Sequence, residues 1–291
     1  MKNKKTIDII CPLYNAEKYL ENLHKSFLKQ KNVNLNNIRY VLTKGKDNTE
    51  KILEKLENCT YKVIEQAEFS HSLTREKEAF ESNSDIIVFV TQDVIIERED
   101  WLYNLTKDII EENCEAAFSK QLCTNNTIEK YTREKNYPKE SYIVTKNDLE
   151  KLGLRTFFFS DASSAIKKDV FVKLKGYDSK NLPINEDMYI AYKLITNGYK
   201  IKYCAESEVI HSHKFTLKQI YDRYYDTGKF FKQNSYLDKY GTNKTGGGMA
   251  KYILKRAIQD KNITVILNFI PNMMARFIGM KMGKNKEIKK K

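Results

Sequence analysis

The sequence predicts a layered α/β fold with a central sheet, followed by a basic, helical C-terminal region. Three observations predict this fold. Short runs rich in β-branched residues alternate with amphipathic helical segments through the first half of the chain. The run Ile86–Val90 is apolar throughout and has the length of one strand. From residue 241 onward, basic residues are interleaved with apolar ones.

The individual elements follow from these patterns. We expect strands at Ile7–Cys11, Ile38–Leu42, Tyr61–Ile64 and Ile86–Val90. Helices are expected to begin at Asn15 and near Asp47, which are good capping residues, and to run around Leu73–Phe80. A further helix carries apolar residues at helical spacing, namely Trp101, Leu102, Leu105 and Ile109. In the second half, Lys168–Lys175 and Glu186–Asn197 predict two helices, each followed by glycine.

The net charge of +13 is distributed unevenly along the chain. Residues 241–291 contain twelve Lys and Arg against two acidic residues, a net charge of +10, so residues 1–240 carry only +3. A nucleic-acid-binding protein would spread basic and aromatic residues over its main domain, and this distribution argues against one. We expect a nearly neutral domain at 1–240 and a basic amphipathic region at 241–291, joined flexibly at Gly246–Gly248.

The sequence indicates a cytoplasmic protein. Its five cysteines are scattered and never form a CxxC pair, which predicts reduced thiols. The N-terminus runs from a short basic tip directly into a strand, unlike a signal peptide. The most apolar stretch, Ile263–Met280, is broken by polar residues and a proline. Its composition suits a helix on an anionic membrane surface, and suits equally well a helix packed on the main domain or between subunits.

The usual phosphate-binding loops are missing. No GxGxxG follows the first predicted strand, and GxxxxGK[ST] does not occur. Dehydrogenases and P-loop enzymes are therefore poor candidates, although the first half has the pattern of a nucleotide-binding fold. We expect a diphosphate to be bound through a divalent metal held by carboxylates.

Asp93 is the first candidate metal ligand. It follows Ile86–Val90 closely, and open α/β sheets bind ligands at the carboxyl ends of their strands. A carboxylate there can hold Mg²⁺ or Mn²⁺, and the alternative is an aspartate that caps the next turn. His211 and His213 follow a strand-like pair of residues, and alternation places both imidazoles on one side. This arrangement fits a metal or phosphate contact.

Asp187 is the candidate general base. Asn185 is expected to cap the next helix, which places Glu186 and Asp187 in the first turn, where the helix dipole favours an ionised carboxylate. Such a carboxylate suits proton abstraction from an acceptor hydroxyl, although acidic residues are also common in first turns for stability alone. His71 and Arg75 are candidates for contact with an anion, and the alternative is a solvated helix start.

Seven segments follow one another along the chain: CPLYN, FSHSLTR, TQDV, FFSDASSAIKKDVF, GYD, NEDMYIAYKL and VIHSH. In this order they resemble family 2 glycosyltransferases, and most closely the bacterial rhamnosyltransferase-type branch. The resemblance covers residues 6–228. It implies a GT-A fold with a mixed central sheet, and an inverting single displacement with a nucleoside-diphosphate sugar as donor.

The resemblance also implies roles for particular residues. The metal would be bound by Asp93 and His213, and the acceptor would be deprotonated by Asp187. Donor or nucleotide contacts would come from Pro12, Tyr14, Asn15, Asp47, His71, Arg75, Gln92 and Asp93. Sugar or acceptor contacts would come from Asp161, Ser163, Ser164 and Glu186.

Three positions depart from the family pattern. Thr91-Gln92-Asp93 stands where a DxD motif is usual, so one carboxylate is missing and weaker metal binding is expected. The loop at 43–49 retains only Asp47 of an acid-rich pattern. Ser72-Leu73 replaces the glycine pair expected after His71.

The implied activity is transfer of a sugar to an acceptor hydroxyl in cell-surface polysaccharide synthesis. L-Rhamnose from dTDP-L-rhamnose is the favoured donor, and a UDP-hexose or UDP-N-acetylhexosamine is the alternative. The acceptor would be a glycan or a lipid-linked molecule, and the enzyme would lie in the cytoplasm, peripheral on the inner face of the cell membrane. A nucleotidyltransferase is disfavoured because CPLYNAEKYL offers no glycine-rich basic loop. A further alternative is a protein with the glycosyltransferase fold that has lost activity, because Asp93 is the single carboxylate of its motif.

Overall fold

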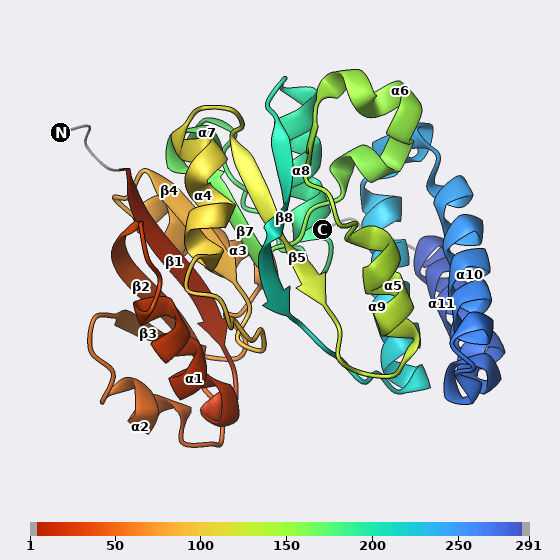
Figure 1. The fold of residues 1–291 in the computed structure, drawn as a ribbon, viewed down its shortest axis with the longest axis horizontal. Helices are drawn as coiled ribbons and strands as arrows, with labels where there is room; N and C mark the ends of the chain where they lie inside the picture. Colours follow the sequence, from red (N-terminus) through yellow and green to blue (C-terminus); the bar gives the residue numbers. More distant parts are fainter. Residues whose placement is uncertain (1–4, 287–291) are drawn as a thin grey trace.

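The computed structural model describes residues 5–286, apart from the side chains of 242–246, so the lysine-rich end at 289–291 lies outside the described residues. Its centre is one eight-stranded sheet in the order β3-β2-β1-β4-β7-β5-β8-β6 (Figure 1). The strands are β1 (Thr6–Leu13), β2 (Asn34–Thr43), β3 (Thr60–Ile64), β4 (Ile86–Val90), β5 (Ala116–Leu122), β6 (Tyr142–Val144), β7 (Ser163–Lys167) and β8 (Ile201–Ile210). Strands β1 to β4 pair in parallel, whereas β7 pairs antiparallel with both β4 and β5. β8 is parallel to β5 and β6 is antiparallel to β8, so the predicted mixed sheet is confirmed.

Helices cover both faces of this sheet. They are α1 (Glu17–Leu28), α2 (Thr49–Leu53), α3 (His71–Glu81), α4 (Trp101–Ile110), α5 (Ile128–Asn136), α6 (Leu149–Leu152), α7 (Lys168–Lys173), α8 (Glu186–Thr196), α9 (Leu217–Gln233), α10 (Thr242–Gln259) and α11 (Ile263–Asn285). Short 3₁₀ turns occur at Lys146–Asp148, Gly153–Phe157 and Ser235–Tyr240. Helices α1 and α4 bury their apolar stripes on one face, and α3, α7 and α8 bury theirs on the other.

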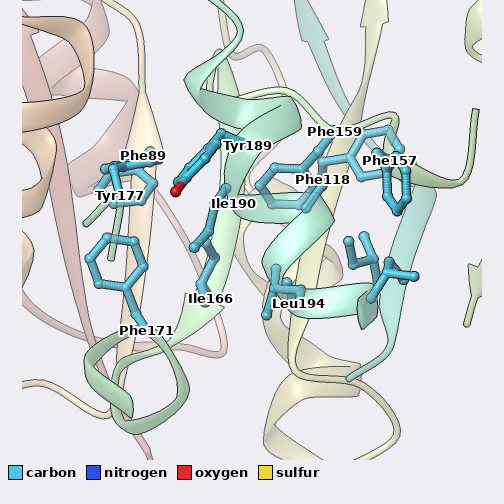
Figure 2. Close-up of a cluster of buried hydrophobic side chains, with 14 of the residues drawn as sticks. Phe89, Phe118, Phe157, Phe159, Ile166, Phe171, Tyr177, Tyr189, Ile190 and Leu194 are labelled. Carbon is cyan, nitrogen blue, oxygen red and sulfur yellow. The ribbon is translucent and has the colours of Figure 1, made fainter. Parts of the chain in front are cut away.

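The central strand β4 shows how the sheet divides the core in two. Val88 packs with α1 and α4, whereas its neighbour Phe89 packs with α7 and α8. Since successive side chains of a strand point to opposite faces, a strand covered on both sides is apolar at every position. Figure 2 shows the second cluster, with Phe89, Phe171, Ile190 and Leu194 among its members.

Two helix starts differ from the prediction. Asn15 precedes the capping residue of α1, adopts a φ of 47°, and its Oδ1 accepts the N–H of Lys46 at 3.0 Å. Asp47 precedes the cap of α2, and its carboxylate accepts the N–H groups of Glu17 at 2.9 Å and Thr49 at 3.2 Å. Both side chains therefore hold the loops after β1 and β2 together, a role that depends on contacts between distant segments.

The sequence pattern does not predict β5, β7, α5 or α9. The reason is clearest in β5, where the polar residues Ser119 and Gln121 are buried. Ser119 hydrogen-bonds to Ser163 and Ser207, at 2.6 and 2.8 Å, from two neighbouring strands. Polar side chains satisfied in this way across a sheet interrupt the apolar run by which a buried strand is recognised.

The C-terminal helices gather beside α5 at one side of the molecule (Figure 1). There Ile128 and Tyr131 of α5 form a separate small core with Ile253 of α10 and Val265 of α11. Helix α10 continues through the glycine run at 246–248, so the prediction of a flexible joint there is wrong.

Helices α9 and α11 approach each other closely. Gly279 and Gly283 of α11 face α9 beside Gly228. A Cβ on Gly283 would lie 2.0 Å from the carbonyl oxygen of Tyr225, and one on Gly228 would lie 2.4 Å from that of Met280. Small residues four apart let two helix backbones meet, as in helix pairs of membrane proteins.

The opposite face of α11 is apolar and exposed. Ile263, Leu267, Ile270, Met274 and Phe277 recur at three- and four-residue intervals and are 55–73% exposed. The polar residues and the proline expected to break this stretch do not end the helix. In the described part of the chain, α11 is the one helix that is long and apolar enough to cross a membrane by length and composition alone, with a mean hydropathy of 1.4.

Candidate active site

A cavity of about 740 Å³ opens at the carboxyl ends of β4, β5 and β8. Seven of the predicted site residues line it: His71, Arg75, Asp93, Asp161, Glu186, Asp187 and His213. Helices α5, α9 and α11 contribute three arginines, Arg133, Arg223 and Arg276. Helix α11, the last one that the structure describes, therefore takes part in the cavity.

Asp93, His211 and His213 converge within it. The carboxylate oxygens of Asp93 lie 3.5 Å from His211 Nε2 and 3.5 Å from His213 Nδ1. The Nε2 atoms of the two histidines are 2.7 Å apart, and one ligand atom from each of the three residues lies within 4.8 Å of the others. One carboxylate and two imidazoles at these distances suit a divalent cation. The structure thus adds His211 to Asp93 and His213, the two metal ligands that the family resemblance implies.

His211 is oriented by a buried glutamine. Its Nδ1 lies 2.9 Å from Oε1 of Gln121, and the amide nitrogen of Gln121 donates to Ser160 at 2.7 Å. Since an amide oxygen only accepts, Nδ1 carries the hydrogen that points to Gln121, and Nε2, which lies 3.5 Å from Asp93, is the nitrogen left to bind a metal ion. Such partners hold metal-binding histidines in the correct orientation.

The ionisation of the cluster also suits a metal. Burial raises the pKa of the Asp93 carboxyl, but its contacts with His211 and His213 outweigh burial and lower the pKa to about 2. Burial lowers the pKa of His213 to about 4. At neutral pH these two residues are therefore an ionised carboxylate and a neutral imidazole, the forms that bind metals.

A group of carboxylates around Arg75 lines another part of the cavity. Arg75 is buried, and its Nη1 contacts Oε1 of Glu186 at 3.3 Å. Asp161 is also buried, and its two oxygens accept hydrogen bonds from Ser164 and Tyr177, both at 2.7 Å. Arg75, predicted to contact an anion, thus already has an anionic partner within the protein.

Asp187 has no cationic partner among residues 5–286, the side chains of 242–246 left aside. Its Oδ1 accepts the N–H of Met188 at 2.7 Å, and within this range Oδ2 accepts no hydrogen bond. Burial raises the pKa of Asp187 well above its ordinary value, and the charges of Glu186 and Asp161 raise it further. The sequence predicted an ionised carboxylate at a helix start capped by Asn185, but that residue has a left-handed φ of 60° instead of a capping conformation. Burial and like charges outweigh the helix dipole here.

Five of the predicted nucleotide contacts, Pro12, Tyr14, Asn15, Asp47 and Gln92, lie outside the lining of this cavity. Gln92 accepts the N–H of Tyr14 at 2.7 Å and donates to its carbonyl oxygen at 2.9 Å. Its amide therefore binds a backbone segment, where a DxD motif would have a carboxylate. With Asn15 and Asp47, these contacts tie together the loops after β1, β2 and β4, and Pro12 lies near the end of β1. The exposed ring of Tyr14 hydrogen-bonds through its hydroxyl to Gln66 at 3.3 Å.

Ser163 and Ser164 are fully buried in β7. The Ser163 hydroxyl accepts a hydrogen bond from Trp101 Nε1 at 3.1 Å, and that of Ser164 donates to Asp161 at 2.7 Å. Both hydroxyls are thus bonded to buried protein groups, whereas the resemblance implied that they contact the sugar or acceptor. Ser163 belongs to a buried hydroxyl network, and Ser164 positions Asp161.

The sequence profile of a family described as Glycosyl transferase family 2 matches residues 8–175, more than half of the chain. The O-antigen chain rhamnosyltransferase RfbN of Salmonella typhimurium is 32% identical over 286 residues, covering 96% of this chain and 90% of the relative. The O-antigen chain rhamnosyltransferase WbaN of Salmonella anatum is 34% identical over 286 residues, covering 95% and 89%. The chain belongs to glycosyltransferase family 2. These relatives also confirm the predicted rhamnosyltransferase-type branch.

Solved structures share the fold of this glycosyltransferase. S. aureus TarS 1-349 in complex with UDP-GlcNAc superposes with a TM-score of 0.59 at 14% identity, over 96% of this chain and 90% of that one. Mannosyltransferase PcManGT from Pyrobaculum calidifontis, in complex with GDP-Man and Mn²⁺, superposes with a TM-score of 0.58 at 13% identity, over 97% and 85%. The predicted GT-A fold is confirmed.

Several lining residues of the glycosyltransferase have no recognisable signal in the sequence, namely Gln121, Arg133, Arg223 and Arg276. They lie on four elements, and no motif links them. Arg276 is held at the cavity by Glu129, at 3.1 Å, and by the hydroxyl of Tyr224, at 2.6 Å. His211, in contrast, is indicated by its spacing to His213, which places both imidazoles on one side of the chain.

Proposed function

We propose that this glycosyltransferase moves a sugar, L-rhamnose from dTDP-L-rhamnose by preference, onto a hydroxyl of a glycan acceptor in cell-surface polysaccharide synthesis, with inversion at the anomeric carbon. One observation carries the proposal: a metal-type cluster at Asp93 and a carboxylate with a raised pKa at Asp187 line the same cavity. Two relatives named as rhamnosyltransferases support the donor sugar.

Asp187 is the proposed general base. Its Oδ2 accepts the proton of the acceptor hydroxyl as the hydroxyl oxygen attacks the anomeric carbon. The bond from that carbon to the diphosphate breaks, and its electron pair leaves with the nucleoside diphosphate. The raised pKa supports this role, because a more basic carboxylate accepts a proton more readily. Glu186 is a weaker candidate since Arg75 neutralises it.

Asp93, His211 and His213 would hold the divalent metal, which supplies charge neutralisation at the leaving diphosphate when bound. Their donor set supports Mn²⁺ over Mg²⁺, because Mg²⁺ prefers oxygen ligands and two of the three donors are imidazole nitrogens. His211 would supply a metal donor in place of the carboxylate that is missing from Thr91-Gln92-Asp93.

The nucleotide is proposed to lie along the loops after β1, β2 and β4. Tyr14 offers an exposed ring there, and a base can stack on such a ring. Asn15, Asp47 and Gln92 act by holding these loops in place, and Pro12 contributes the end of β1.

Residues 241–291 are proposed to form a membrane-facing region on the catalytic domain of residues 1–240. Helix α11 contains no acidic residue, and its exposed apolar face supports contact with an anionic bilayer at the inner face of the cell membrane. A lipid-linked acceptor would then lie within reach of the cavity that the same helix lines.

Nucleoside-diphosphate release from a panel of dTDP-L-rhamnose, UDP-glucose and UDP-GlcNAc tests the proposal, with Mn²⁺, Mg²⁺ or chelator. Release from dTDP-L-rhamnose, lost with chelator and in Asp187→Asn, is the expected result. Preferential release from a UDP-sugar would establish the alternative donor. Failure of every donor to react, together with no thermal stabilisation by any donor, would overturn the proposed activity.

A further inference from the structure

Four arginines line the cavity, and two of them already neutralise a carboxylate. Arg75 and Arg276 each pair with a glutamate of the cavity, at 3.3 and 3.1 Å. Arg133 and Arg223 take part in no ion pair with the side chains that the structure describes. Neither of these two guanidinium groups therefore has a direct ion-pair partner among those side chains.

Arg133 is the more constrained of the two. Its Nε is buried and has no hydrogen-bond partner within the described part of the chain. Its Nη1 lies 3.5 Å from the hydroxyl of Tyr137, and its Nη2 lies 3.4 Å from Nδ1 of His211. That Nδ1 directs its own hydrogen at Gln121 and so has no lone pair for another donor. A guanidinium with five N–H groups is thus left with one distant oxygen acceptor, which favours an anionic ligand.

Arg223 reaches the same histidines through an aromatic ring. Its guanidinium carbon lies 5.0 Å from the ring centroid of Phe215, and that ring stacks on His213 with centroids 4.9 Å apart. A cation–π contact positions a guanidinium without using its N–H groups. Arginines from α5 and α9 therefore both lie next to the pair His211 and His213, with N–H groups still available.

We propose that Arg133 and Arg223 bind the diphosphate of the nucleotide sugar and remain in contact with it as it leaves. The inference rests on the proposed function above. Planar guanidinium groups match pairs of phosphate oxygens, and two positive charges suit a diphosphate better than a neutral acceptor sugar. Because negative charge grows on the leaving oxygen as its bond breaks, the two arginines stabilise the transition state more than the bound donor.

Calorimetric binding of thymidine diphosphate, uridine diphosphate and inorganic pyrophosphate in the presence of Mn²⁺ tests the inference. The variants are Arg133→Met, Arg223→Met and the double substitution, because methionine keeps an unbranched apolar stem. The matched control is Arg256→Met on α10, where Arg256 pairs with Glu134 outside the cavity. Mn²⁺ affinity without nucleotide is measured in parallel by electron paramagnetic resonance.

Each single substitution is expected to weaken diphosphate binding about tenfold, and the double substitution about a hundredfold, with Mn²⁺ affinity and the control unchanged. Unchanged affinity for all three diphosphates would overturn the inference and leave the proposed function intact. Parallel loss of Mn²⁺ affinity would assign the arginines to holding His211 and would also overturn it. A wild-type protein that binds neither nucleoside diphosphate would contradict the proposed function itself, and this inference with it.

Discussion

Asp187 and Glu186 are neighbours in the first turn of α8, yet their surroundings differ. Arg75, from α3, neutralises Glu186, whereas burial and two nearby carboxylates raise the pKa of Asp187. A residue 111 positions away in the chain thus distinguishes two adjacent acids. Replacing each acid by its amide, as Asp187→Asn or Glu186→Gln, is therefore expected to change the stability of the protein in opposite directions.

Asp187→Asn is expected to lower the transfer rate by about 10²–10⁴-fold and to raise thermal stability at neutral pH. Because the folded-state pKa lies above the unfolded one, the folded protein binds this proton more tightly. The contribution of Asp187 to the free energy of unfolding therefore falls as the pH rises from the unfolded-state pKa to the folded-state pKa. Asparagine does not ionise, so the variant does not lose this stability. Thermal unfolding at roughly pH 5 and pH 8 should show the larger stabilisation at the higher pH.

Glu186→Gln serves as the control, because it removes the charge partner of buried Arg75 and should lower stability. Equal stability changes in the two amides, or an Asp187→Asn protein that retains full transfer, would contradict the assignment of the base.

The pH dependence of transfer follows from the same group. The base must be ionised, so kcat/KM should fall on the acid side with a midpoint well above the ordinary value of 3.8 for an aspartate. Asp93, with a pKa of about 2, stays ionised over this range and does not add to the decline. Initial rates measured across pH with saturating Mn²⁺ check this, and a midpoint at the ordinary carboxyl value would argue against Asp187.

Gln121→Leu is expected to weaken Mn²⁺ binding about 10–100-fold, because it removes the partner that orients His211. Electron paramagnetic resonance of bound Mn²⁺ measures the change. Gln259→Leu on α10, where the glutamine contacts Arg256, is the control and should bind Mn²⁺ like the wild type. Wild-type affinity in both variants would show that Gln121 does not orient a metal ligand.

Helix α11 joins two surfaces of different character. Its inner face carries the glycines that meet α9 and Arg276, which contacts the cavity. Its outer face carries the exposed apolar stripe of Ile263, Leu267, Ile270, Met274 and Phe277. One helix therefore places the apolar stripe at a fixed position relative to the cavity.

Two glycine-to-alanine substitutions in the C-terminal helices should change the free energy of unfolding in opposite directions. Gly283→Ala would place a Cβ 2.0 Å from a backbone oxygen of α9, so we expect a loss of about 1–3 kcal/mol in the free energy of unfolding. Gly247→Ala in α10 meets no atom of the described chain within 4 Å and should gain about 0.5–1 kcal/mol through helix propensity. Denaturant unfolding measures both, and a neutral Gly283→Ala would mean that α9 and α11 are not closely packed.

Residues 241–291 carry +10 of the net charge of +13, and the described large apolar side chains that are more than 60% exposed all lie on α11. We expect the protein to bind vesicles containing anionic lipid, and Leu267→Glu with Phe277→Glu to abolish binding because both residues are about 70% exposed on one stripe, at 73 and 68%. Val172→Glu on α7, an exposed apolar residue elsewhere, should bind normally.

Vesicle co-sedimentation at low and high salt measures this binding, which should weaken with salt. If the double variant instead converts a dimer to a monomer in analytical ultracentrifugation, with vesicle binding unchanged, the stripe is a subunit interface and the membrane proposal fails.

The local patterns of the chain were enough to predict many of its elements, its family and three central side chains. Apolar periodicity locates β1 to β4 and α8 because it reports on residues that are close in the chain. Asp93, Asp187 and His213 stand directly after or within such elements, so their place at one edge of the sheet follows from local structure.

Other features depend on contacts between segments that are distant in the chain, and no local sequence pattern predicts them. The antiparallel insertion of β7, the burial of Ser163 and the loop contacts of Asn15 are examples. Arg276 reaches Glu129 across 147 positions of sequence and so brings the C-terminal helix to the cavity. The raised pKa of Asp187 has the same origin, because desolvation and the distance between charges are properties of the folded chain and not of any segment of it.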